Sequence, residues 1–287
     1  MQIGFLRSLL FGRYGALWVQ LVTELGLEPV FAQEADTLAA LQISGLVEIP
    51  SISFQVAAAE AKALSDCALL IVPDLNPNAD VPRGGGADPW IANFSEMLAT
   101  SVAGLPPIAD VPVAADVTTV EARATELLLT LSRDPARSRR AWERHSHLAG
   151  TPRHATPRFQ RIPGETKTIA VVGQPWLFKE GILAALRSSL GDEVHLLLQT
   201  GLEPQTLREE GWRAEARLVP TDAECLGASR YFARRAVVDS LIVLADKRSG
   251  ADNWLLSQIK KLSHKPVQAV YLQDLITADS FDSLLDV

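Results

Sequence analysis

Cysteine is nearly missing from this sequence. The 287 residues contain two cysteines, Cys67 and Cys225, which are far apart and belong to no C-x-x-C pair. This spacing excludes a disulfide framework and a cysteine-rich metal site. Such sparing use of cysteine fits a reducing compartment, so a cytoplasmic protein is predicted.

Basic charge and long apolar runs are also scarce. The chain has 27 Lys and Arg against 34 Asp and Glu, a formal net charge of −7. Nucleic acid is not an expected partner, because contacts to phosphates need a positive surface. No apolar run is long enough to span a membrane, and the opening MQIGFLRSLLFGRYG lacks the apolar core of a signal peptide. Neither a membrane partner nor export is predicted.

The chain does contain short apolar runs that alternate with helical patterns. Apolar residues make up 47 % of the sequence, enough to bury the cores of two domains. The alternation predicts βαβ units, and therefore an α/β fold with parallel sheets of the Rossmann or flavodoxin type. The expected strands are Gln2–Leu6, Glu28–Phe31, Ala68–Val72, Thr168–Val172, Glu193–Leu198, Asp239–Ala245 and Val267–Leu272.

Helical periodicity fills most of the chain between these strands. The segment GTPRHATPRFQRIPGET, residues 150–166, is instead rich in proline and polar residues. We therefore predict a first domain over residues 1–149, a linker over 150–167 and a second domain over 168–287. The expected helices are Tyr14–Leu25, Thr37–Ile43, Phe54–Leu64, Thr118–Leu131, Asp134–Leu148, one ending at Leu190, Thr221–Arg234, Asp252–Leu262 and Leu275–Val287.

Three stretches could carry a binding function. The turn Gly173-Gln-Pro-Trp176 lies between a strand and a helix, where it could hold an anion or simply form a tight turn. The glycines 84–86 beside Asp88 could cradle a phosphate or form a loop tip, and no P-loop Lys-Ser/Thr follows them. The arginine-rich segment 133–144 could meet an anionic partner or form a solvated helix face.

The stretch Ser249-Gly-Ala-Asp252 follows an apolar strand. Ser249 lacks the G-x-S-x-G setting of a nucleophile, and no histidine is placed to act as its base. Asp252 is a reasonable N-cap for the following helix, which would make the stretch a structural turn. Upstream, Thr221-x-x-Glu224 has the spacing of a capping box.

The order of several motifs resembles the 2-hydroxyacyl-CoA dehydratase-related family. The opening residues 3–18, IGFLRSLLFGRYGALW, are similar to the family's Ile-Gly-Ile-Pro-Arg-Ala-Leu start, and Leu25-Gly26 matches the end of its first helix. Gly173-Gln-Pro-Trp176 is similar to the family's Gly-His-Pro-Tyr. Thr221–Arg234 resembles the helix before its central strand, and Ser249-Gly-Ala-Asp252 resembles its Cys-Gly-Pro-Asp.

The resemblance implies two α/β domains facing each other across a cleft. Three cysteines there hold a 4Fe–4S cluster, which an ATP-dependent activator supplies with electrons. Here the three cysteine positions fall at Ser249, near Glu48-Ile-Pro50, and at or beside Asp88-Pro89. Serine and carboxylate oxygens do not build a stable 4Fe–4S site, and Gln174 stands where the family has histidine. The resemblance thus implies a scaffold without its redox chemistry and without a cofactor.

We therefore expect a non-redox homologue that binds a small molecule or a partner protein in the cleft. No catalytic residue is assigned. One alternative is an enzyme that uses a hard divalent metal at Glu48, Asp88 and Ser249. Another is a structural subunit paired with a cysteine-bearing homologue, and a dimer is compatible with either. The candidate ligand-binding residues are Glu48, Asp88, Gln174, Trp176, Ser249 and Asp252.

Overall fold

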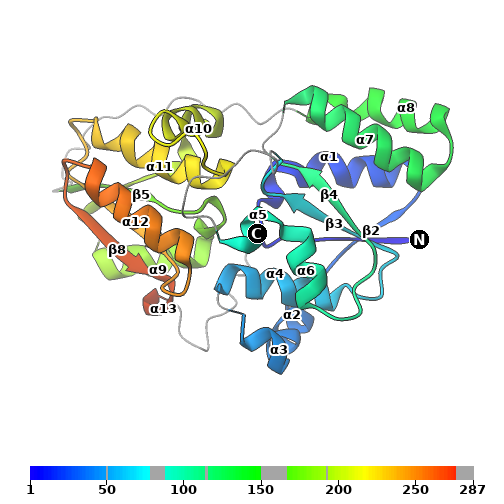
Figure 1. Ribbon diagram of the computed structural model, residues 1–287, viewed down its shortest axis with the longest axis horizontal. Helices are drawn as coiled ribbons and strands as arrows, with labels where there is room; N and C mark the ends of the chain where they lie inside the picture. The colour runs from blue at the N-terminus through cyan, green and yellow to red at the C-terminus, as the bar shows by residue number, and fades with distance from the viewer. Residues whose placement is uncertain (50, 78–87, 114–115, 150–166, 192, 276–287) are drawn as a thin grey trace. The chain divides into compact units, whose positions relative to one another are not determined.

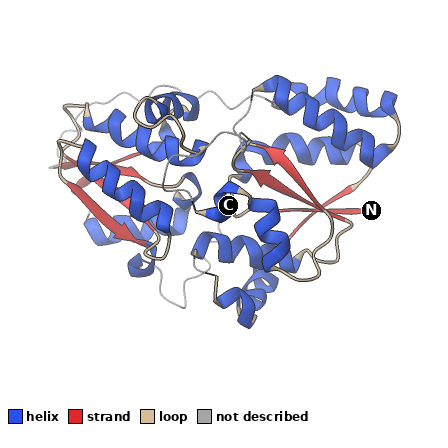
Figure 2. Ribbon diagram, in the orientation of Figure 1, coloured by secondary structure: helices blue, strands red, loops and turns tan. Residues whose placement is uncertain are grey.

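The computed structural model contains two four-stranded parallel sheets, with the strand orders β2-β1-β3-β4 and β6-β5-β7-β8 (Figures 1 and 2). This confirms the predicted α/β class with two parallel-sheet domains. The structure describes residues 1–49, 51–77, 88–113, 116–149, 167–191 and 193–275. The chain divides into a first unit (residues 1–77, 93–152 and 287) and a second unit (78–92 and 153–286). Apart from Lys167, the predicted linker lies outside the described residues.

The first unit is built around a core in which Ile3, Phe5, Trp18 and Ile71 are fully or almost fully buried. α1 and the α7–α8 pair share this core, whereas α6 packs against β3 and β4, and α2 packs against α4 (Figure 1). Its elements are β1 (Gln2–Phe5), α1 (Phe11–Glu24), β2 (Glu28–Phe31), α2 (Glu34–Leu41), α3 (Ser44–Val47), α4 (Ile52–Ala63), β3 (Leu69–Asp74), α6 (Phe94–Ser101), β4 (Ile108–Pro112), α7 (Val117–Ser132), α8 (Pro135–His145) and the 3-10 helix η1 (Ser146–Leu148).

The second unit has its core between the sheet and the neighbouring helices α11 and α12 (Figure 1). All six residues of β7 are buried, as expected for a central strand covered on both faces. Its elements are α5 (Pro89–Ala92), β5 (Lys167–Val172), η2 (Pro175–Leu177), α9 (Glu180–Leu190), β6 (Val194–Leu198), η3 (Gln199–Gly201), α10 (Pro204–Trp212), α11 (Pro220–Ala233), β7 (Ser240–Ala245), α12 (Gly250–Leu262), β8 (Val267–Tyr271) and α13 (Leu272–Leu275).

Helices α10 and α11 approach each other closely through two glycines. A Cβ atom on Gly227 would lie 1.8 Å from the Leu207 carbonyl oxygen, and one on Gly211 would lie 2.0 Å from that of Ala223. Because any larger residue would overlap the opposite backbone, these glycines permit the packing of α10 on α11. The Arg208 guanidinium on α10 pairs with the Glu224 carboxylate on α11 at 2.9 Å, with both side chains buried.

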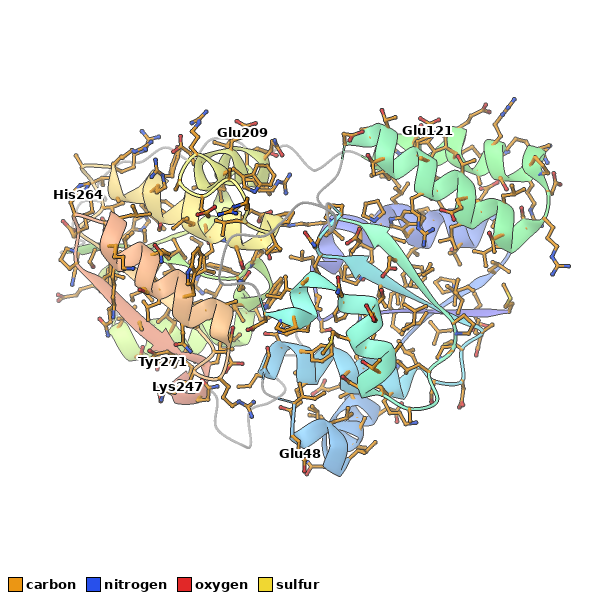
Figure 3. All side chains as sticks on the ribbon, viewed as in Figure 1. Glu48, Glu121, Glu209, Lys247, His264 and Tyr271 are labelled. Atoms are coloured by element: carbon orange, nitrogen blue, oxygen red, sulfur yellow. The ribbon has the colours of Figure 1, made fainter. Side chains whose placement is uncertain are left out.

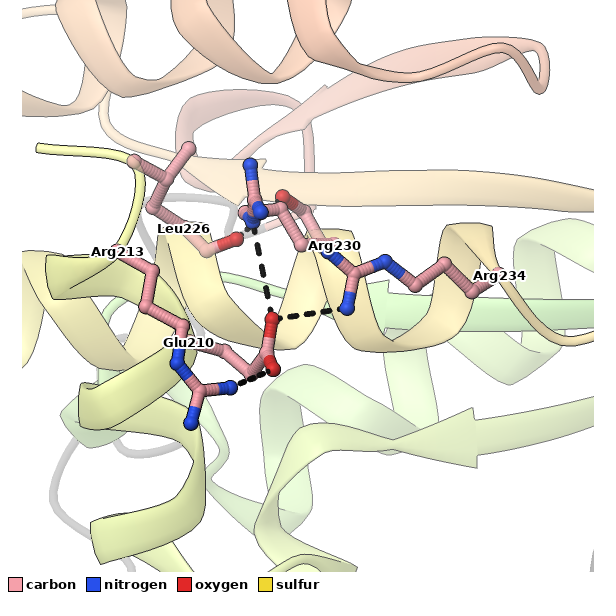
Figure 4. A network of polar contacts seen from close by, with 6 residues as sticks. Glu210, Arg213, Leu226, Arg230 and Arg234 are labelled. Atoms are coloured by element: carbon pink, nitrogen blue, oxygen red, sulfur yellow. Dashed lines mark hydrogen bonds and ion pairs between the residues drawn. The ribbon is translucent and has the colours of Figure 1, made fainter.

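The outer ends of the same two helices carry a more exposed ion cluster. The Glu210 carboxylate faces Arg213, Arg230 and Arg234 (Figure 4). The Arg234 guanidinium lies 3.0 Å from Glu210 and is more than half exposed, so this contact adds little stability. The cluster therefore supplements the glycine packing of α10 on α11.

Two predicted helix features differ from the structure. The N-cap of α11 is Val219, followed by Pro220, so Thr221 and Glu224 do not form the predicted capping box, and Glu224 pairs with Arg208 instead. Of the predicted last helix, only Leu275 is described, at the end of the short α13, and the rest lies outside the described residues. Within the described residues, no helix is long and apolar enough to cross a membrane.

The strand order places one switch point in each sheet, between β1 and β3 and between β5 and β7. At such a point the chain leaves two adjacent strands toward opposite sides of the sheet. Ligands of open α/β sheets bind in the crevice that this creates beyond the carboxyl ends of the strands. In the second unit the segments at this position begin at Gly173 and Asp246.

Candidate binding site at the carboxyl edge of the second sheet

The turn after β5 approaches the neighbouring strand β7 very closely. A Cβ atom on Gly173 would lie 2.9 Å from the Leu244 carbonyl oxygen, so glycine is needed here. The Gly173 N–H donates to Gln199 Oε1 at 3.1 Å, which fixes the orientation of the Gln199 amide at the end of β6. The turn therefore brings the next residue, Gln174, into the switch point.

Gln174 donates from Nε2 to Asp222 Oδ1 at 2.6 Å, and both side chains are buried. Asp222 lies in the first turn of α11. The pKa of Asp222 is raised to about 7, chiefly by burial and in smaller part by the negative charge of Asp88, while the hydrogen bond from Gln174 lowers it in part. The carboxyl group of Asp222 can thus gain or lose a proton near neutral pH.

Ser249 forms the N-cap of α12. Its Oγ accepts a hydrogen bond from the Asp252 N–H at 3.0 Å and donates one to Asp88 Oδ2 at 2.7 Å. The other oxygen of Asp88 accepts from the Ala251 N–H at 3.1 Å. Asp88 and Ser249 therefore satisfy the amino terminus of α12 together. The prediction that Asp252 caps this helix is wrong, because Ser249 has the capping geometry.

The Asp252 carboxylate instead turns back to the loop after β7. Its Oδ2 accepts from the Asp246 N–H at 2.8 Å. The pKa of Asp252 is raised to about 8, chiefly by burial and then by the negative charges of Asp222, Asp246 and Asp88, while that hydrogen bond lowers it in part. The charge of Asp88 contributes to the raised pKa of both Asp222 and Asp252, and the charge of Asp222 contributes to that of Asp252, so the three carboxyl groups belong to one electrostatic environment.

Four buried polar atoms at this site have no hydrogen-bond partner among the described residues. They are Gln174 Oε1, Gln199 Nε2, Thr221 Oγ1 and Asp222 Oδ2. The side chains that carry them are 2 % exposed or less. Buried polar atoms are almost always hydrogen-bonded, because an unsatisfied one costs about 1–3 kcal/mol. A ligand that reaches these four atoms would remove that cost.

Two tryptophans add an aromatic surface. Trp176 lies in η2 and Trp90 in α5, with ring centroids 5.3 Å apart and planes tilted by 55°. Both residues are buried. A few oriented polar groups beside aromatic side chains are typical of small-molecule sites.

Five of the six predicted site residues belong to the second unit. Hydrogen bonds join Asp88, Ser249 and Asp252, and the charge effects link them to Asp222, the partner of Gln174. Glu48 belongs to the first unit, where it follows α3 and its side chain is exposed (Figure 3).

The sequence did not indicate four further residues of this site, Trp90, Gln199, Thr221 and Asp222. Thr221 and Asp222 lie in the first turn of a helix, where polar residues are common as caps. Their polarity was therefore interpreted as capping, and the sequence did not indicate that they lie at the switch point. Gln199 follows the edge strand β6 and belongs to no motif. Segments that follow neighbouring parallel strands lie at the same edge of the sheet. This rule could have indicated Gln199, as it did Gln174.

The described residues give no support to a metal or thiolate site. No group of three or more His, Cys, Asp or Glu side chains in this part of the chain could hold a metal ion. Asp88 and Ser249 direct oxygen atoms at each other. Burial first, then the charges of Asp252, Asp222 and Glu224, raise the pKa of the Cys225 thiol well above its usual value, so it stays protonated. Glycines 84–86 lie outside the described residues.

The first unit has two open cavities lined by described residues. One, of about 740 Å³, lies between α1 and η1, and its Arg144 and His145 already face Glu24. The other, of about 600 Å³, lies along α6 and β4. Neither contains a predicted site residue, whereas the polar cluster of the second unit contains five.

Comparison with known proteins identifies no relative of this chain. No family model, no curated protein and no solved structure matches it. The similarity to the dehydratase-related family therefore stays a prediction from the sequence motifs.

Proposed function

We propose that this chain is a non-redox binding protein, related to 2-hydroxyacyl-CoA dehydratase-type proteins, that binds a small molecule at the carboxyl edge of its second sheet. The observation that carries the binding function is the set of four buried polar atoms without a partner among the described residues. They lie on the turn after β5, the end of β6 and the first turn of α11. In open α/β sheets, ligands bind at this position, beyond the carboxyl ends of the strands.

The non-redox part of the proposal is supported by Ser249. Its oxygen bonds both the Asp88 carboxylate and the Asp252 N–H, so it serves the helix terminus. Cys67 and Cys225 are both buried, and burial raises the pKa of each thiol, most strongly for Cys225. A thiolate ligand for iron is therefore disfavoured at either position. The family relation itself rests on the sequence resemblance.

A small molecule fits this site better than a partner protein does. The unsatisfied atoms belong to side chains that are at most 2 % exposed, so the surface of a folded partner would not reach them. The buried pair of Trp90 and Trp176, the latter two residues after Gln174, supplies aromatic surface in the same unit. A ligand of a few heavy atoms would replace the missing hydrogen bonds and rest against the aromatic rings.

The proposal is tested by an isosteric change. Thr221→Val removes only the unpartnered hydroxyl, so the free protein should remain folded and keep or gain stability. The wild-type protein should carry a bound mass in native mass spectrometry, or show a raised melting temperature with some member of a set of small polar metabolites. Thr221→Val should weaken that binding, and Thr206→Val at an exposed position of α10 should not.

Two results would contradict the proposal. One is the absence of any co-purified mass or stabilising compound. The other is a ligand whose affinity is the same for Thr221→Val and for the wild type, because such a ligand would bind elsewhere.

A further inference from the structure

We propose that the site takes a small cation, a primary ammonium group with a hydrogen-bond acceptor one or two atoms away. This inference rests on the proposed function, because it names the ligand class for the same site. It follows from the kinds of atoms at the site and from the finding that the ion pairs of the described residues leave its aspartates out.

The unsatisfied atoms are mostly acceptors. Gln174 Oε1 is an acceptor only, and so is Asp222 Oδ2 when Asp222 is ionised. The Thr221 hydroxyl can also accept. An ammonium group carries three donors and no acceptor, so it matches this set. Gln199 Nε2 is the one amide donor of the four, and it would bond a hydroxyl or carbonyl oxygen on the same ligand.

The charges at the site also favour a cation. The negative charge of Asp88 raises the pKa of Asp222 and of Asp252, and the charge of Asp222 raises that of Asp252. The ion pairs recorded in the described part of the second unit involve none of these three residues. A carboxylate or phosphate on the ligand would face the same groups and be repelled.

Helix termini do not reverse this preference. The amino ends of α11 and α12 lie at the site, and each is equivalent to about half a positive charge. Each already has an aspartate in its first turn, Asp222 in α11 and Asp252 in α12. At about pH 8 Asp222 is mostly ionised and Asp252 is about half ionised, so the two aspartates together offset the positive ends of both helices.

A cation bound here would compete with protons. Among the described residues, the ionisable groups linked by charge to Asp222, directly or through Cys225 and Asp252, are Asp88 before α5, Cys225 and Glu224 on α11, and Asp246 and Asp252 at the β7–α12 connection. All of them raise the local negative potential when ionised. An ammonium ligand should therefore bind about tenfold more tightly at about pH 8 than at about pH 6, because a carboxyl group with a pKa near 7 is mostly ionised only at the higher pH.

Three probes of nearly equal size separate the ligand classes. Ethanolamine carries an ammonium and a hydroxyl, ethylene glycol carries two hydroxyls, and glycolate carries a carboxylate and a hydroxyl. Each would be titrated into the full chain at about pH 8, with the indole N–H signals of Trp90 and Trp176 followed by NMR. Ethanolamine stays protonated there, because aliphatic amines have pKa values near that of lysine, about 10.4.

The charge is tested with Asp222→Asn, which keeps the shape of the side chain and an oxygen for Gln174. The matched control is Glu209→Gln, which removes an exposed carboxylate from α10 in the same unit (Figure 3). We expect ethanolamine to shift the indole signals, ethylene glycol to bind at least about tenfold more weakly, and glycolate to cause no shift. Asp222→Asn should weaken ethanolamine binding by about tenfold, and Glu209→Gln should leave it unchanged.

Several outcomes would overturn the inference. If glycolate or ethylene glycol binds as tightly as ethanolamine and Thr221→Val weakens it, the ligand class is wrong while the proposed function stands. If ethanolamine shifts no signal at high millimolar concentration, or binds Asp222→Asn as it binds the wild type, no cation site exists here. If Asp222→Asn does not fold by circular dichroism, the pH titration of the wild type decides, and an affinity that does not rise with pH refutes the inference.

Discussion

The contact between Asp88 and Ser249 joins residues 161 positions apart in the sequence and makes a quantitative prediction. Ser249→Ala removes the N-cap of α12, which costs about 0.5–2 kcal/mol at a typical helix. It also removes the 2.7 Å hydrogen bond to the Asp88 carboxylate, and a bond to a charged group contributes about 1.5–3 kcal/mol. Asp88 is partly exposed, which favours the lower end, so we expect a total loss of about 2–4 kcal/mol.

A double-mutant cycle isolates the pair. Asp88→Ala loses the same bond and also the bond from the Ala251 N–H. If the two side chains act together, the double variant should be more stable than the sum of the single losses predicts, by about 1–2 kcal/mol. Ser249→Thr is the matched control, because it keeps the hydroxyl and its capping capacity.

The measurement combines urea unfolding by far-UV circular dichroism with hydrogen exchange of α12. The free energy of unfolding gives the cycle, and the exchange rates of the amides of residues 250–262 show whether the loss lies at this helix. Additive losses within about 0.5 kcal/mol would mean that Asp88 and Ser249 do not interact, and the shared cap would be refuted. Unchanged hydrogen-exchange rates in α12 would show that the loss of stability does not lie at this helix.

Three further predictions concern other parts of the molecule. The pKa of Asp222 is about 7 in the folded protein, above the ordinary carboxyl value, so protonated Asp222 stabilises the fold at about pH 4 and this stabilisation is lost as the pH rises through 7. Asp222→Asn should reduce the fall in unfolding free energy between about pH 5 and about pH 8 by a few kcal/mol, since each tenfold gain in proton affinity on folding corresponds to about 1.4 kcal/mol. A pH dependence equal to that of the wild type would contradict this. Gly227→Ala gains about 1 kcal/mol of helix propensity, but its Cβ would overlap the Leu207 carbonyl, so urea unfolding should show a net loss of at least about 2 kcal/mol, and a stabilised variant would disprove the close approach of α10 and α11. Protein produced anaerobically with iron and sulfide should contain no iron–sulfur cluster, and stoichiometric iron and sulfide with cluster absorbance would refute the non-redox proposal.

Two of the predicted strands are continuous or nearly continuous apolar runs. Ala68–Val72 and Asp239–Ala245 correspond to β3 and β7, which are central in their sheets. The missed strand, β4, reads IADVP, and its Asp and Pro argue against a strand. It is tolerated because β4 lies at the edge of its sheet, where proline removes no needed hydrogen bond.

Helix α10 was also missed, for a different reason. Its sequence PQTLREEGW contains few apolar residues, so it has no clear helical periodicity. Its position depends on the close contact through Gly211 and Gly227 and on the Arg208–Glu224 pair with α11. These are tertiary contacts between residues that local patterns do not relate.

The sequence predicted those residues of the candidate site that directly follow a strand. Gln174 and Ser249 follow the apolar runs that became β5 and β7, so the rule for parallel sheets placed them together. Asp222 was not predictable in this way. Its partner Gln174 is 48 positions away, and only the folding of α11 against the sheet brings the two side chains within 2.6 Å.

The two sheets have the same strand order, and each unit places a buried acid on the helix before its third strand. In the first unit this is Glu60 on α4, whose two oxygens accept from the backbone N–H groups of Arg7 at 2.6 Å and Ser8 at 2.9 Å. Burial raises the pKa of Glu60, and these hydrogen bonds lower it again in part. A carboxyl group held by two backbone donors cannot exchange these partners unless the loop after β1 moves.

Asp222 occupies the corresponding helix in the second unit, but its one hydrogen bond comes from the Gln174 side chain and its Oδ2 has no described partner. A side-chain donor can rotate away without moving the backbone, so this carboxyl group can exchange partners at low cost. The same topology therefore uses its acid to fix a loop in the first unit and leaves an exchangeable acid in the second. That difference is the physical reason to expect ligand binding at the second switch point.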